Sequence, residues 1–75
     1  MKLQIAGLST GHDRVVIRQV GTARSHWYYA GQQLLAVDAL DDPRAFMAAK
    51  RMLANGVSPT PDAVADPRTD LKDLT

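Results

Sequence analysis

Few side chains in this 75-residue sequence have the types and spacing that chemistry requires. Nucleophilic catalysis needs a Ser, Cys or Thr activated by an oriented base, and the best candidates are the neighbours Ser25 and His26. Adjacent residues of a strand point to opposite faces of a sheet, so these two side chains are poorly placed to act together. We therefore predict no catalytic residue, and we do not expect the chain to be an enzyme.

Candidate metal ligands and paired acids are equally sparse. The cluster His12, Asp13 and His26 falls short of a zinc site, which takes three or four ligands at compatible spacing, because two of its members share one loop. The adjacent acids Asp41 and Asp42 are explained by helix capping. The sequence has no glycine motif that would cradle a phosphate. We predict neither a metal site nor a cofactor.

The distribution of charge is the one feature that suggests a binding surface. Residues 1–30 contain four cations against one acid, with aromatic side chains between them. A basic sheet face with an aromatic residue can contact a protein or bind a nucleic acid by stacking its bases. It can also be an ordinary solvated face on which Arg18 stacks over Tyr28. The predicted partner-binding residues are Lys2, Arg14, Arg18, Arg24, His26 and Tyr28.

A helix that spans 43–54 is the clearest predicted element. Asp42 is a suitable N-cap, and Pro43 suits the first helical position because its missing N–H would be unpaired there. Asn55 and Gly56 supply a left-handed end. Apolar residues recur between these caps at helical spacing, so the helix has one apolar face.

The hydrophobic pattern before this helix has a period of two, which predicts strands at 2–8, 14–20 and 26–30. Turn residues separate consecutive strands, so we expect two hairpins. The segment 33–40 fits either a helix or a strand that spans 33–37, and we favour the strand. The expected fold class is α+β: a small antiparallel sheet of three or four strands with one helix packed on a face.

The predicted register defines which side chains form the core. Ile5 is placed opposite Ile17, and Arg18 is placed opposite Tyr28. We then expect one apolar face to meet the helix, while Arg18 turns outward to solvent. The expected shared interior consists of Ile5, Ile17, Trp27 and Phe46.

The last nineteen residues differ in character from the rest. Residues 57–75 hold three of the four prolines, four of the eight Asp residues and no aromatic side chain. Such a segment buries too little area to offset about 1–2 kcal/mol of backbone ordering per residue. We predict one compact domain at 1–56 followed by a disordered acidic tail at 57–75.

Composition limits the function further. The chain has no Cys, a net charge of +1 and no apolar run as long as a membrane span, so we expect a cytoplasmic protein without membrane contact. By elimination we expect a non-enzymatic regulator or inhibitor that binds a larger bacterial machine. The transcription apparatus is the first expected target, and a phage or mobile element is the expected origin. The alternatives are a nucleic-acid-binding module and, because the core is thin, a homo-oligomer subunit.

Overall fold

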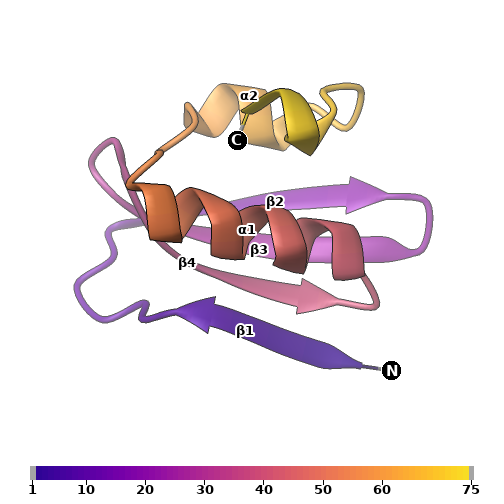
Figure 1. The fold of residues 1–75 in the computed structure, drawn as a ribbon, viewed down its shortest axis with the longest axis horizontal. Helices are drawn as coiled ribbons and strands as arrows, with labels where there is room; N and C mark the ends of the chain where they lie inside the picture. Colours follow the sequence, from indigo (N-terminus) through magenta and orange to yellow (C-terminus); the bar gives the residue numbers. More distant parts are fainter. Residues whose placement is uncertain (1, 75) are drawn as a thin grey trace.

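The computed structural model describes residues 2–74 and shows a four-stranded antiparallel sheet with helical segments on one face (Figure 1). Its strands are β1 (Leu3–Gly7), β2 (Arg14–Val20), β3 (Ala23–Ala30) and β4 (Gln33–Leu40), and its helical segments are α1 (Pro43–Asn55), α2 (Pro61–Ala65) and the 3₁₀ turn η1 (Leu71–Leu74). The α+β class and the long helix predicted from the sequence are confirmed. The ambiguous segment 33–40 is a strand.

The strands follow the order β1–β4–β3–β2. Two-residue turns join β2 to β3 and β3 to β4, and their glycines, Gly21 and Gly31, have the positive φ of about +60° that such turns favour. The predicted hairpin between the first two strands is wrong, because β1 pairs with β4. Residues 8–13 link β1 to β2 across three strand spacings, roughly 14 Å, and a six-residue link reaches roughly 20 Å when extended.

The tight turn between β2 and β3 determines which face each side chain occupies. It sets Val20 opposite Ala23 and therefore Arg18 opposite Ser25, while Tyr28 pairs with Val15. The predicted pairing of Arg18 with Tyr28 is therefore wrong. Arg18 is only 5% exposed and lies on the inner face of the sheet, the face that the helices cover.

The core is built from the inner face and differs from the predicted one. Trp27 is fully buried and Phe46 packs against the core, as expected. Ile5 and Ile17 are instead 60% and 50% exposed, because the register turns both to the outer face. The Trp27 indole donates to the buried Ser25 hydroxyl at 2.8 Å, so these two buried polar groups satisfy one another.

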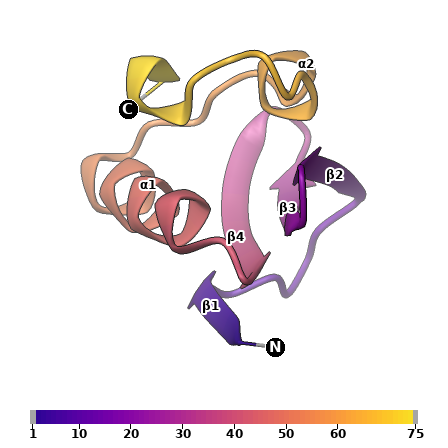
Figure 2. The same ribbon diagram turned by 90° about the vertical axis from the view of Figure 1, so that its right-hand side faces the viewer.

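The predicted disordered tail is a folded part of the domain as far as residue 74. A helix is about 10 Å wide, whereas four strands span roughly 19 Å. Accordingly α1 packs over β1 and β4, while α2 packs over β2 and η1 packs against α1 (Figure 2). Pro61, Val64 and Leu71 are buried by this arrangement, so the compact domain continues past residue 56.

Within residues 2–74, no helix combines the length and apolar character that crossing a membrane would need.

Candidate functional site

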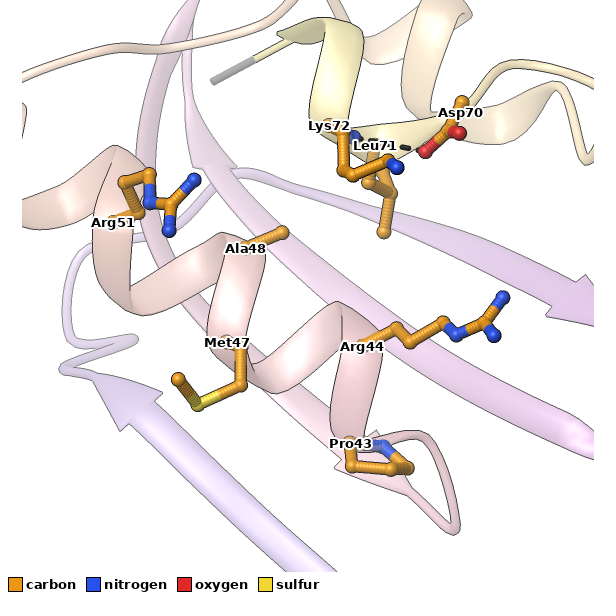
Figure 3. Close-up of a pocket in the computed structure, with 8 residues that line it drawn as sticks. All are labelled: Pro43, Arg44, Met47, Ala48, Arg51, Asp70, Leu71 and Lys72. Atoms are coloured by element: carbon orange, nitrogen blue, oxygen red, sulfur yellow. Dashed lines mark hydrogen bonds between the residues drawn. The ribbon is translucent and has the colours of Figure 1, made fainter.

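An open groove of about 520 Å³ runs between α1 and η1. The helix begins at Asp42, whose carboxylate accepts from the Ala45 N–H at 3.1 Å, and ends at Gly56 in a left-handed conformation. Ala45, Ala49 and Met52 are the buried residues of α1. The residues of α1 that line the groove recur at helical spacing on a second face, and η1 and the residue before it form the opposite wall (Figure 3). The lining consists of Pro43, Arg44, Met47, Ala48, Arg51, Asp70, Leu71 and Lys72.

The groove is positively charged. Arg44, Arg51 and Lys72 contribute three cations against the single acid Asp70, which gives +2. The whole of α1 carries three cations and no acid. Among residues 2–74, no carboxylate forms an ion pair with Arg44 or Arg51, so both guanidinium groups are available to an external anion.

Apolar surface accompanies this charge. Met47 lies between the two arginines on α1 and is 60% exposed, and Leu71 of η1 also lines the groove. Methionine is flexible and polarisable, so it adapts to partner surfaces of varied shape. The groove thus offers charge for attraction and a soft apolar contact between its two arginines.

The six residues predicted to bind a partner do not form one surface. Arg24, His26 and Tyr28 lie on the outer face of β3. Lys2 is exposed beside β1, at one edge of the sheet, and its N–H donates to the Asp41 carboxylate at 2.6 Å. Arg14 is exposed at the start of β2, on the opposite edge.

Arg18 holds the C-terminal segment and has no surface for a partner. Its guanidinium donates to the backbone carbonyls of Val64 at 3.1 Å and Asp66 at 2.7 Å, and to that of Thr69. A buried cation is tolerated only when hydrogen bonds replace its hydration, and here peptide carbonyls do so. The predicted outward direction of Arg18 is therefore wrong.

A small polar cluster occupies the outer face. The Tyr28 hydroxyl donates to the Asp38 carboxylate at 2.8 Å, and the His12 ring contacts the Tyr28 ring edge-on at 5.0 Å. This hydrogen bond, with help from desolvation, raises the pKa of Tyr28. The His12 ring donates through Nδ1–H to the Ser9 carbonyl at 2.8 Å.

Neither this cluster nor any other carries metal-binding geometry. Among residues 2–74, no three His, Cys, Asp or Glu side chains are grouped closely enough to hold an ion. The Ser25 hydroxyl is occupied by Trp27, and His26 lies on the opposite face of the sheet. Ser25 and His26 are therefore not brought together as a nucleophile and its base.

Comparison with known proteins identifies the family. The chain matches the reductase C-terminal family over residues 1–75, its full length. It belongs to that family.

The relatives are named reductases. Rhodocoxin reductase of Rhodococcus erythropolis is 40% identical over 75 residues, and putidaredoxin reductase of Pseudomonas putida is 30% identical over 76 residues. These matches cover 95% and 96% of this chain but only 17% and 18% of the relatives. The chain thus spans less than a fifth of the proteins that it resembles.

Solved structures share the fold of this reductase C-terminal chain. One is the covalent complex of putidaredoxin reductase with putidaredoxin, with a TM-score of 0.88 and 30% identity over 96% of this chain and 18% of that one. Another is the ferredoxin reductase for the CYP199A2 system of Rhodopseudomonas palustris, with a TM-score of 0.88 and 32% identity over 95% of this chain and 18% of that one.

These matches overturn the function predicted from the sequence. The family is one of reductases, so the predicted non-enzymatic regulator of transcription, with a phage or mobile-element origin, is wrong. The prediction relied on the absence of catalytic motifs from the sequence. A chain that spans less than a fifth of its relatives need not contain the catalytic motifs of those relatives. The nucleic-acid and homo-oligomer alternatives gain no support from the relatives.

The basic groove was missed for a different reason. Arg44 and Arg51 are seven positions apart, which places them on one helical face, and no acid lies between them. That signal is visible in the sequence. The opposing wall could not be predicted, because the sequence pattern predicts that residues 70–72 belong to a disordered tail.

Proposed function

We propose that this chain is the C-terminal domain of an oxidoreductase that delivers electrons to a small acidic redox protein, and that the α1–η1 groove helps to dock this protein. The observation that carries the proposal is the unpaired Arg44 and Arg51 in a groove of charge +2, on a domain of the reductase C-terminal family. A relative forms a complex with putidaredoxin, which supports a protein partner. The cytoplasmic location expected from the sequence is retained as part of the proposal.

Electrostatic docking suits this task. An electron carrier must bind quickly, in a defined orientation, and leave again, and such interfaces are small and weak. Charge complementarity accelerates encounter and sets orientation more than it adds affinity. In this role Arg44 and Arg51 attract and orient carboxylates of the partner, while Met47 supplies an adaptable apolar contact.

The test is a charge reversal in the full-length reductase that contains this chain. With an acidic ferredoxin as electron acceptor, Arg51→Glu is expected to raise KM roughly tenfold, or about 1.4 kcal/mol. Turnover with a small uncharged acceptor should stay unchanged, because that acceptor does not need the groove.

Arg14→Glu is the matched control. It makes the same change of charge at an exposed residue outside the groove, on the sheet edge far from α1. Its KM for the ferredoxin should stay within twofold of the unsubstituted enzyme. Equal effects of the two substitutions, or no effect of Arg51→Glu, would show that the groove is not the docking site.

A further inference from the structure

The two methionines of α1 lie in opposite environments. Met47 is 60% exposed and lines the α1–η1 groove, whereas Met52, on the same helix, is fully buried. Seven large hydrophobic side chains among residues 2–74 are exposed, and Met47 is the one among them that contains sulfur. A thioether is oxidised to a sulfoxide where an oxidant can reach its sulfur. Exposure therefore makes Met47 susceptible to oxidation and burial shields Met52.

Two cations flank Met47 on its helix. Arg44 precedes it by three positions and Arg51 follows it by four, and residues at these spacings are neighbours on a helix surface. All three side chains line the groove (Figure 3), and no carboxylate among residues 2–74 forms an ion pair with either arginine. A guanidinium group has only donors, and a sulfoxide oxygen accepts hydrogen bonds far better than thioether sulfur does. The surroundings of Met47 therefore favour its oxidised form.

We propose that Met47 is a site of reversible oxidation by hydrogen peroxide, and that its sulfoxide weakens docking of the redox protein. The sulfur attacks one oxygen of the peroxide, so an S–O bond forms as the O–O bond breaks. The leaving hydroxyl group takes the proton of the transferred oxygen and departs as water. Sulfur loses two electrons and the peroxide gains them. A thiol-dependent sulfoxide reductase reverses the change, because two thiols supply two electrons and two protons and yield a disulfide and water.

Oxidation alters the groove in two ways. It converts a flexible apolar side chain into a polar one, so the adaptable apolar contact between the arginines is lost. The sulfoxide oxygen also occupies guanidinium donors that would otherwise meet carboxylates of the partner. The effect on docking rests on the proposed function, whereas the oxidation itself depends only on the exposure of Met47.

Peptide mass spectrometry of the intact reductase tests the oxidation. Trypsin cleaves after Lys and Arg, so Met47 lies on the peptide 45–50 and Met52 lies on the peptide 52–68. The reductase is treated with hydrogen peroxide without its redox partner, and the gain of one oxygen atom is followed on each peptide. We expect Met47 to be oxidised at least about tenfold faster than Met52, and the two rates to converge in urea. Equal rates in the folded reductase would overturn the inference.

Steady-state kinetics after removal of the peroxide by catalase test the effect on docking. The KM for an acidic ferredoxin should rise roughly threefold to fivefold, as expected for the loss of part of an apolar contact. Turnover with a small uncharged acceptor should not change. Met47→Leu is the control, because leucine cannot form a sulfoxide, so the KM of this variant should be the same before and after peroxide. A rise in KM that persists in Met47→Leu would overturn the inference, since another residue would then cause it.

Failure of this inference can be distinguished from failure of the proposed function. If Arg51→Glu raises KM but oxidation of Met47 does not, the groove docks the redox protein and the effect of oxidation on docking is wrong. If Arg51→Glu has no effect while Met47 is oxidised faster than Met52, the docking site is wrong and Met47 remains a site of oxidation.

Discussion

Arg18 shows how a single side chain can decide whether a segment folds. Its positive charge is stabilised by the backbone carbonyls of Val64, Asp66 and Thr69, and no carboxylate among residues 2–74 forms an ion pair with it. Hydrogen bonds that involve a charged group contribute about 1.5–3 kcal/mol each, and a buried carbonyl left unpaired adds a further cost. Arg18 therefore stabilises the backbone path of the whole C-terminal segment.

Replacement of Arg18 by Ala is expected to lower the free energy of unfolding of the chain by about 3 kcal/mol, because three buried or partly buried carbonyls lose their donor. Arg18→Lys should recover only part of this loss, since one ammonium cannot reach all three acceptors. Urea denaturation followed by circular dichroism measures the free energies of unfolding of both variants. Arg24→Ala, at an exposed position of the same sheet, is the control and should change stability by less than about 0.5 kcal/mol. A loss no larger than that of the control would refute the anchoring role.

Tyr29 gives the domain a defined response to alkaline pH. Its hydroxyl donates to the Pro59 carbonyl at 2.8 Å, and burial raises its pKa to about 12, a rise that the Arg14 charge partly opposes. A Tyr in the unfolded chain has a pKa near 10, so above that pH the unfolded state releases a proton that the folded state keeps. The contribution of Tyr29 to the free energy of unfolding is thus complete below about pH 10 and is lost as the pH rises toward 12.

We expect the free energy of unfolding to fall between pH 10 and pH 12 in the unsubstituted chain and to fall less in Tyr29→Phe. At pH 8 the Phe variant should be less stable by about 1 kcal/mol, because it lacks the hydrogen bond to Pro59. The comparison isolates Tyr29, since every other residue is the same in the two chains. If the free energy of unfolding falls equally in the two proteins between pH 10 and pH 12, Tyr29 does not cause the response to alkaline pH.

At the scale of the element, the segment 57–74 completes a cover that α1 cannot provide alone. Val64 of α2 is fully buried over the half of the sheet that α1 leaves open, and Leu71 of η1 is buried beside α1. The Thr60 hydroxyl accepts from the Ala63 N–H at 3.4 Å and caps α2. Packing against the sheet orders this proline-containing segment despite its polar composition.

Val64→Ala should therefore reduce the free energy of unfolding by about 2 kcal/mol through lost burial and the cavity left behind. Val15→Ala removes the same atoms from a residue that is 44% exposed, and its cost should stay below about 0.5 kcal/mol. Chemical denaturation of the two variants provides the comparison. Equal losses would indicate that α2 does not pack on the sheet as described.

Local signals predicted the elements well and their arrangement poorly. The helix was recognisable because Asp42, Pro43 and Gly56 bound a periodic apolar stretch, and the structure has the same caps. The tail was misjudged because its apolar residues are spread over eighteen positions and show no period. The missing information was the width of the sheet. A four-stranded sheet needs more than one helix to cover it, and residues 57–74 supply the second part of the cover.

At the scale of the whole molecule, the net charge is only +1, yet positive charge is concentrated in the α1–η1 groove. The α1–η1 groove has a charge of +2, whereas the outer face of the sheet is apolar at its margins and carries Arg24 and Asp38 on its central strands. The sequence could not show this distribution of charge, because the strand register decides which face of the sheet each charged side chain occupies. One misplaced pairing, Arg18 with Tyr28, moved a buried cation to the surface and Ile5 and Ile17 to the interior.

The docking proposal predicts a dependence on salt. Between 0.1 M and 1 M ionic strength the Debye length falls from about 10 Å to about 3 Å, so attraction between exposed charges weakens. The KM of the full-length reductase for an acidic ferredoxin should rise over this range, and the rise should be smaller in Arg51→Glu. Steady-state kinetics with an uncharged acceptor corrects for effects of salt on the enzyme itself. A KM independent of ionic strength would argue against an electrostatic groove.

The separation of Arg18 from its acceptors also governs the order of events at the ribosome. Val64 follows Arg18 by 46 residues and Thr69 follows it by 51. At the usual synthesis rate this interval lasts roughly 2 to 10 seconds, and until it ends the acceptors of Arg18 are not all synthesised. The sheet and α1 are therefore synthesised before the segment that covers the rest of their inner surface, so the arrival of α2 and η1 completes the packing of this domain.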